Sequence, residues 1–285
     1  MDPSAIRWKK LVEGRLGEME RLQEGRGVLG GQFWDKRARR FSKGPMASAD
    51  SDPMASRLRQ AVGGDRAPTR SVLDVGSGPG RFSLLIAPRA TAVTAVDPSR
   101  RMLEILRKRA REQGISNVRT VHGKWQEVDV EPADVVLCSH VVTLVADAAP
   151  FIRKLHAAAR QKVLLYVGAY AIDAVLDPFW RHFHNNPRKP GPTYVDALRV
   201  VEELGLRPAV EVVEVRARSR HDSLADAVEV YRDTLVLPKT AEVRKELTRL
   251  LDPWLQRRDG GLYAPFRTQP AAIISWPGGA PPAAP

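Results

Sequence analysis

Two acidic residues and a run of glycines in the first third of the chain could together bind a ligand. The segment SVLDVGSGPGRF spans residues 71–82, where Asp74 precedes a loop that contains Gly76, Gly78 and Gly80. Glycine has no Cβ and adopts a positive φ at little cost, so such a loop lets the backbone lie against a bound molecule. The flanking apolar residues predict a buried strand before the loop and a helix after it. The segment therefore predicts a nucleotide-type cradle.

The spacing of the glycines narrows the class of nucleotide. Arg81 stands where the dinucleotide-binding pattern G-x-G-x-x-G needs a small residue, so the pattern here is G-x-G-x-G. No Gly-Lys-Ser or Gly-Lys-Thr follows, which excludes a P-loop. A carboxylate at Asp74 would repel a pyrophosphate, and we expect it to face a cationic group of the ligand instead.

A second acid, Asp97, ends the next predicted strand in TAVTAVDPS, residues 91–99, and is followed by Pro98. A carboxylate at the end of the second strand can accept hydrogen bonds from both hydroxyls of a ribose. This order of acid, glycine loop, helix, strand and acid resembles the class I S-adenosylmethionine-dependent methyltransferases, over about residues 70–170. A NAD-type dinucleotide-binding domain is the alternative.

The resemblance implies a fold and a cofactor. The fold is an α/β, Rossmann-like, seven-stranded and mostly parallel sheet with an antiparallel last strand and helices on both faces. The cofactor is S-adenosyl-L-methionine, and the expected contacts to it near the first two strands come from Asp74, Gly76, Ser77, Gly78, Gly80, Asp97 and Pro98.

The third predicted strand, residues 118–123, should end near the adenine ring in this family. Many members carry an acid after the glycine there, whereas this chain has Gly123, Lys124 and Trp125. Lys124 cannot accept a hydrogen bond from the adenine amino group, although Glu127 could. Trp125 could stack on the ring or bind a ring nitrogen through its backbone N–H. Lys124 and Trp125 are therefore cofactor-binding candidates.

The fourth predicted strand, residues 133–142, should end near the methyl donor. Its end carries Ser139, a candidate cofactor contact, and His140, which could orient or deprotonate a substrate. His140 could equally contact the methionine end of the cofactor. Cys138, in the middle of the strand, is expected to be a small core residue.

Aromatic residues outside these strands are candidates for a substrate pocket. Trp34 lies in FWDKRARRF, which resembles a segment that helps close the cofactor pocket in such methyltransferases; a packing helix is the alternative. Tyr170, Trp180 and His184 lie in a later stretch, where packing is again the alternative. His182 and His184 are two residues apart with no carboxylate or cysteine at ligand spacing, so no metal is expected.

The chain divides into two predicted parts. Residues 1–69 form an N-terminal helical extension and connector, beginning with an amphipathic helix at 4–24. Residues 70–285 form the methyltransferase domain, with insertions at about 170–193 and 220–260. The last strand, 271–276, is expected to be antiparallel.

Composition adds bounds on location and partners. Residues 1–24 carry charges throughout, no apolar stretch is long enough to span a membrane, and Cys138 is the single cysteine, so a cytoplasmic location is expected. The net charge is +12, and almost all of the excess lies in residues 1–170. A basic surface is typical of nucleic-acid binders, but arginine-rich solvated helix faces explain it as well. No oligomeric state is predicted.

The expected function is in-line methyl transfer from S-adenosylmethionine to an O, N or C nucleophile of a small molecule. The chain lacks the N-P-P-Y or D-P-P-Y run with which methyltransferases acting on adenine hold the amino group. One alternative is an RNA (rRNA or tRNA) methyltransferase that uses the basic N-terminal half. A second is a non-catalytic methyltransferase-like assembly partner, suggested by Lys124.

Overall fold

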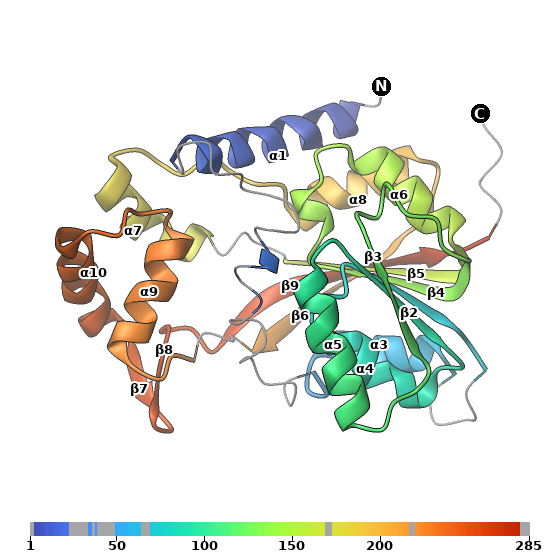
Figure 1. The fold of residues 1–285 in the computed structure, drawn as a ribbon. Helices are drawn as coiled ribbons and strands as arrows, with labels where there is room; N and C mark the ends of the chain where they lie inside the picture. The colour runs from blue at the N-terminus through green and yellow to red at the C-terminus, as the bar shows by residue number, and fades with distance from the viewer. Residues whose placement is uncertain are drawn as a thin grey trace.

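A seven-stranded sheet forms the centre of the computed structural model, which describes residues 3–22, 34–35, 38, 49–63, 69–168, 173–216 and 220–279. The strand order is β3-β2-β1-β4-β5-β9-β6 (Figure 1). The strands are β1 (Val72–Val75), β2 (Val93–Asp97), β3 (Val118–His122), β4 (Ala133–Ser139), β5 (Ala159–Gly168), β6 (Ala209–Arg216) and β9 (Thr268–Pro277). In this sheet β9 runs opposite to the other six strands and lies between β5 and β6. The predicted fold is confirmed.

Helices cover both faces of the sheet, which is why its central strands are apolar on both sides. All four residues of β1 are buried. One face packs against α1 (Pro3–Leu22), α6 (Ala148–Ala157) and α8 (Tyr194–Glu203). The other packs against α3 (Pro53–Ala61), α4 (Arg81–Ile86) and α5 (Arg100–Glu112).

A second hydrophobic cluster lies beyond one edge of the sheet, in a part that we call the helical lobe. The lobe comprises α7 (Asp173–His184), α9 (Leu224–Thr234), α10 (Ala241–Trp254) and the hairpin of β7 (Gln256–Arg258) and β8 (Gly261–Tyr263). Its core includes Leu176, Trp180, Tyr231, Leu247 and Leu251. Helices of both predicted insertions thus pack into one cluster.

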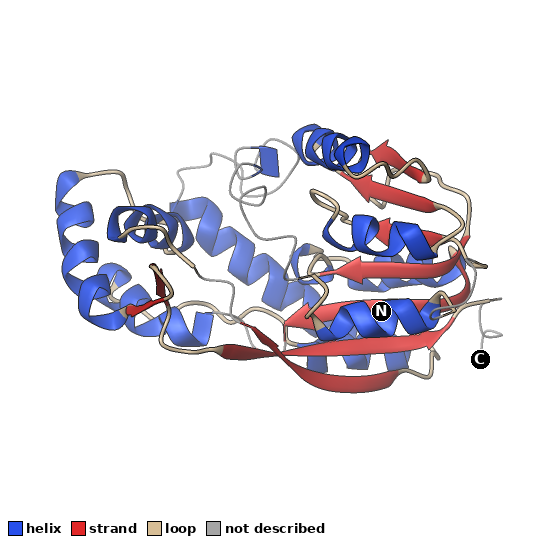
Figure 2. Ribbon diagram, turned by 90° about the horizontal axis from the view of Figure 1, so that it is seen from below, coloured by secondary structure: helices blue, strands red, loops and turns tan. Residues whose placement is uncertain are grey.

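The connections fix the lobe at the edge where the parallel strands end. The chain leaves β5 for α7 and leaves β6 for α9, and it returns from β8 to the start of the antiparallel β9. All three crossings therefore lie at the carboxyl ends of the parallel strands, and Figure 2 shows the lobe beyond this edge.

Helix α1 lies along both parts and joins them (Figure 1). Trp8 is completely buried in the sheet core, and its indole N–H donates to the carbonyl oxygen of Val145 at 2.7 Å. Farther along the helix, Met19 packs against the lobe core. The Glu18 carboxylate accepts from the backbone N–H of Lys189, which follows α7, at 3.1 and 3.2 Å.

Several predicted boundaries shift in the structure. The predicted strand at 133–142 ends at Ser139, because the chain turns at His140 and enters a short 3-10 helix, η3 (Val142–Leu144). Helix α6 ends at Ala157, and β5 already begins at Ala159. Within the described residues, every helix is too short or too polar to cross a membrane.

Candidate functional site

The strand order places a ligand site between β1 and β4. From β1 the sheet continues through β2 and β3 on one side and through β4 and β5 on the other, so the order reverses at this pair. In open parallel sheets, ligands bind outside the carboxyl ends of the strands at such a switch point. The glycine loop follows β1 there, and His140 follows β4.

The three glycines of the loop have different surroundings. A Cβ added at Gly76 would lie 2.2 Å from Cγ2 of Val141, and one at Gly80 would lie 2.7 Å from Cγ of Leu106. A Cβ added at Gly78 would have no heavy atom within 4 Å. Gly76 and Gly80 are therefore needed for packing against β4 and α5, whereas the backbone of Gly78 faces open space that a ligand can fill.

Asp97 lies against this open glycine. Its Oδ2 accepts from the backbone N–H of Gly78 and its Oδ1 accepts from that of Ser99, both at 2.8 Å. Burial raises the pKa of Asp97, and the nearby Asp35 carboxylate adds to the effect. The structure thus brings together the loop and the second acid, and Pro98 lies beside them with its carbonyl oxygen 3.1 Å from Nε2 of His122.

Ser77 adds a polar group to the loop. Its hydroxyl is buried and has no hydrogen-bond partner among the described residues. Buried polar side chains are nearly always paired, so this hydroxyl offers a hydrogen bond that a ligand at the switch point could complete. The hydroxyl, the open Gly78 backbone and the Asp97 carboxylate form a site suited to a polar ligand of nucleoside type.

Asp74 lies in β1, just before the loop. Only 2% of the residue is exposed, and its Oδ2 accepts a 2.6 Å hydrogen bond from the hydroxyl of Ser83 on α4. Burial raises the pKa of Asp74 to about 6, and the Asp97 carboxylate contributes. Its contact with a cationic ligand group stays a prediction.

His140 stands at the end of β4 in a conformation unusual for a residue with a side chain. Its φ is +57°, and its backbone N–H donates to the carbonyl oxygen of Tyr166 at 2.8 Å. The residue is exposed, and its ring centre is 4.7 Å from that of Tyr166. The protein atoms crowded around the end of β4 and the positive Arg81 guanidinium lower the pKa of His140 from its ordinary 6.5, although water still reaches the residue, so the ring is largely neutral at pH 7. Ser139, beside it, is half-buried.

A further acid, Asp52, lies in the predicted connector outside every motif, yet its carboxylate acts on His140 and binds Tyr166. Asp52 accepts from the Tyr166 hydroxyl and from Arg81, and it also caps the N-terminus of α3. No motif in the predicted connector points to Asp52. Its partner Arg81 does carry a signal, because an arginine stands where the dinucleotide pattern has a small residue.

Asp35 brings the N-terminal extension to the second acid. It accepts hydrogen bonds from the Ser99 hydroxyl and from the backbone N–H of Arg101, so it caps α5. Its neighbour Trp34 is half-buried. The resemblance implies that this segment lies near the cofactor, and Asp35 does contact the helix that follows Asp97.

The other predicted site residues lie in different surroundings. Lys124 is exposed and pairs with Glu127 at 2.9 Å. Trp125 is 4% exposed within the sheet core, with the Lys154 ammonium 4.9 Å from its ring centre, which favours packing over stacking on a ligand. Cys138 is a buried core residue, as predicted.

In the lobe, the predicted pocket residues serve packing. Trp180 is completely buried. Its ring centre lies 4.2 Å from that of His184 and 4.4 Å from Cζ of Arg188. Nε2 of His184 lies 2.8 Å from the carbonyl oxygen of Leu235. Tyr170 lies outside the described residues. The described contacts of Trp180 and His184 therefore fit the packing alternative rather than a substrate pocket.

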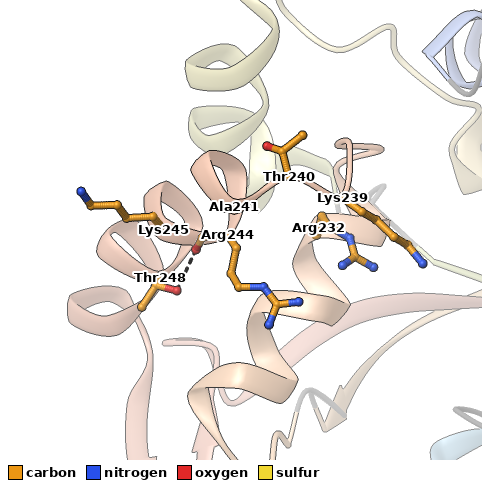
Figure 3. Close-up of a pocket in the computed structure, with 7 residues that line it drawn as sticks. All are labelled: Arg232, Lys239, Thr240, Ala241, Arg244, Lys245 and Thr248. Atoms are coloured by element: carbon orange, nitrogen blue, oxygen red, sulfur yellow. Dashed lines mark hydrogen bonds between the residues drawn. The ribbon is translucent and has the colours of Figure 1, made fainter.

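A hollow of about 510 Å³ opens on the lobe itself, at α9 and α10 (Figure 3). It is lined by Arg232, Lys239, Thr240, Ala241, Arg244, Lys245 and Thr248. Both arginines pair with the Glu229 carboxylate, at 2.5 and 2.9 Å. The hollow lies in the lobe and apart from the switch point, and the charges of its two arginines are explained by ion pairs within the protein.

Comparisons with known proteins agree with the fold and the loop. Residues 72–162 match a family model described as "Methyltransferase domain". An uncharacterized protein of Haemophilus influenzae is 34% identical over 134 residues, 46% of this chain and 48% of that protein. The uncharacterized methyltransferase YcgJ of Bacillus subtilis is 30% identical over 123 residues, 42% of this chain and 48% of that protein. The chain thus spans about half the length of these curated relatives.

Solved structures show the same fold over more of the chain. Magnesium protoporphyrin IX methyltransferase (ChlM) of Synechocystis, with SAH bound, superimposes with a TM-score of 0.53 and 14% identity, covering 93% of this chain and 96% of that one. YcgJ of Bacillus subtilis gives a TM-score of 0.52 at 17% identity, covering 79% of this chain and 97% of that one. These structures show the fold that the resemblance to class I methyltransferases implied.

Proposed function

We propose that this protein, which carries a class I S-adenosylmethionine-dependent methyltransferase domain, transfers the methyl group of S-adenosylmethionine to an O, N or C atom of a small molecule. The observation that carries the proposal is the arrangement at the switch point. There the open backbone of Gly78, the orphaned Ser77 hydroxyl and the Asp97 carboxylate lie together.

These residues fit the polar parts of the cofactor. A carboxylate such as that of Asp97 can accept from two adjacent ribose hydroxyls. Ser77 and the backbone of the loop offer hydrogen bonds to its amino-acid part, and the missing side chain at Gly78 leaves room for it. When bound, S-adenosylmethionine supplies a methyl group that is already activated by its positive sulfur.

The main task of the protein is therefore to align the acceptor and exclude water. Alignment of two reactants is worth roughly 7–11 kcal/mol of the barrier. His140 can contribute by accepting, at an imidazole nitrogen, the proton that an O–H or N–H acceptor loses, and by passing it to water. Its neutral ring at pH 7 has a lone pair available for this.

The position of the helical lobe supports a small acceptor. Three chain crossings place the lobe at the edge of the sheet where the site lies. A lobe there can cover a bound small molecule, whereas an RNA strand needs an open path. One neighbour of the same fold, ChlM, is named for methylation of a small molecule, magnesium protoporphyrin IX.

The test has two stages. First, isothermal titration should show that S-adenosylhomocysteine binds the wild type and that Asp97→Asn binds at least about tenfold more weakly, a loss of about 1.4 kcal/mol. Asp129→Asn, at an exposed acid, is the matched control and should bind as the wild type does.

Second, the protein is incubated with labelled methyl donor and fractionated cell extract. The proposal expects label in small metabolites. Label in RNA would support the alternative of an RNA methyltransferase, which is based on the net charge of +12. The affinity of the protein for RNA should then fall steeply as the salt concentration rises. No binding of S-adenosylhomocysteine by the wild type would overturn methyl transfer altogether.

A further inference from the structure

A buried ion pair connects the N-terminal extension to the candidate site. The Asp52 side chain has no exposed surface, and its Oδ2 lies 2.5 Å from a guanidinium nitrogen of Arg81. Its Oδ1 accepts from the Tyr166 hydroxyl at 2.9 Å and from the backbone N–H of Met54 at 2.9 Å. We call Asp52, Arg81 and Tyr166 the buried cluster.

The members of the buried cluster come from three distant parts of the chain. Asp52 precedes α3, Arg81 is the first residue of α4 directly after the glycine loop, and Tyr166 lies on β5. Their contacts fix α4, which follows β1, to β5, which neighbours β4. The cluster thus connects the two sides of the switch point.

His140 rests on this cluster through its backbone and its ring. Its N–H donates to the carbonyl oxygen of Tyr166, and its imidazole packs on the Tyr166 ring at 4.7 Å. The next residue, Val141, fills the space beside Gly76. The position of the imidazole relative to the glycine loop therefore depends on where Tyr166 and Arg81 lie.

We propose that Asp52 is a positioning residue for methyl transfer, which acts through Arg81 and Tyr166 to hold the His140 imidazole toward the reacting atoms. The inference rests on the proposed function. A buried ion pair is a poor device for stability alone, because well-packed apolar residues of similar volume often do as well. The pair of Asp52 and Arg81 instead fixes the position of Tyr166, and with it the direction of the His140 imidazole, and it fixes the charges near that ring.

The charges around His140 make the inference testable without knowing the acceptor. The described charged groups that act on the imidazole are Arg81, which disfavours its protonation, and Asp52, which favours it; the Tyr166 hydroxyl is neutral because burial raises its pKa. Removing Arg81 and removing the Asp52 charge should therefore move the titration of His140 in opposite directions.

The variants can separate the links of the cluster. Asp52→Asn keeps an oxygen for Met54 and Tyr166, and asparagine caps a helix about as well as aspartate, so only the pairing with Arg81 is lost. Tyr166→Phe removes only the hydroxyl. The matched control is Arg57→Gln, which breaks the other tie of α3 to the sheet, the pair of Arg57 with Glu211 at 2.6 and 2.7 Å.

The first measurement is an NMR titration of isotope-labelled histidines, with the His140 signal assigned by its loss in His140→Asn. We expect Arg81→Gln to raise the titration midpoint of His140 by about one pH unit, Asp52→Asn to lower it, and Arg57→Gln to leave it unchanged. The second is steady-state kinetics with the acceptor that the label-transfer experiment identifies. Asp52→Asn and Tyr166→Phe should lower kcat at least about tenfold, with the KM for S-adenosylmethionine within about threefold of the wild-type value.

The outcomes separate the two proposals. A wild type that does not bind S-adenosylhomocysteine ends the proposed function and this inference with it. A wild type that binds it, with an unchanged His140 midpoint in Arg81→Gln or an unchanged kcat in Tyr166→Phe, overturns this inference alone. Equal losses of kcat in Arg57→Gln and Asp52→Asn would show that α3 docking is all that matters, which also overturns it. If Asp52→Asn does not fold, Tyr166→Phe and Arg81→Gln decide.

Discussion

Replacing Gly78 by alanine should weaken cofactor binding, whereas Gly76→Ala should lower the free energy of unfolding more than Gly78→Ala does. Both glycines have positive φ, +53° and +74°, so alanine at either costs about 1–2 kcal/mol in the backbone. At Gly76 the new Cβ would also lie 2.2 Å from Val141, and such overpacking adds about 1–3 kcal/mol. At Gly78 it meets nothing within 4 Å of the protein.

When the cofactor is bound, the methyl group added at Gly78 should overlap with it and destabilise the complex. If overpacking costs about 1–3 kcal/mol against the bound cofactor, the dissociation constant for S-adenosylhomocysteine rises about 5- to 150-fold. The assay pairs isothermal titration with urea unfolding of Gly76→Ala, Gly78→Ala and the wild type. Adding Val141→Ala to Gly76→Ala removes Cγ2 and should recover part of the stability.

Two results would refute this reasoning. One is a Gly78→Ala variant that binds S-adenosylhomocysteine as tightly as the wild type, because the open space would then not be the cofactor site. The other is a Gly76→Ala variant no less stable than Gly78→Ala, because the contact with Val141 would then not restrict the loop.

Three further predictions concern single side chains. His140→Asn, which suits the positive φ, should lower kcat by about 10²–10⁴ and leave S-adenosylhomocysteine affinity within about threefold in titration calorimetry, if His140 moves a proton. Asp74 binds its proton more tightly in the folded protein, where its pKa is about 6, than in the unfolded chain, where it is 3.8. Its ionisation therefore lowers stability as pH rises from about 4 to 7, and urea unfolding should show the wild type losing about 3 kcal/mol more than Asp74→Asn over that range. Parallel curves of stability against pH for the two proteins would contradict the burial argument. Trp8→Ala should lower the free energy of unfolding by about 3–5 kcal/mol, whereas Ile6→Ala, at a position 38% exposed on the same helix, should change it by less than about 0.5 kcal/mol; equal effects would mean that α1 is not anchored through Trp8.

The sheet and the glycine loop could be predicted because their signals are local. Apolar runs of four to ten residues and the G-x-G-x-G spacing are contiguous in the sequence, and backbone sterics relate them to strands and a turn. The joint placement of Gly78 and Asp97 also followed, because the ends of neighbouring parallel strands meet at one edge.

Side-chain direction and distant partners could not be predicted in this way. The sequence shows that Asp74 interrupts an apolar run, but not that its buried carboxylate would accept a hydrogen bond from Ser83. Trp125 and Trp180 lie in a predicted loop and a predicted insertion, yet both side chains are buried by packing. Asp52 lies 114 residues from Tyr166, and no local pattern encodes a contact over that separation.

The place of β9 sets the order in which the sheet can be completed. β6 ends at Arg216, but in the sheet it pairs with β9, which begins only at Thr268, and not with β5. During synthesis, β6 has no neighbour until the last part of the chain has emerged, and its backbone hydrogen bonds stay unmade until then. Val210 and Val212, which stay exposed in the folded protein, lie on an unpaired strand during that interval, and an unpaired apolar strand in a chain that ends before Thr268 is a site for aggregation.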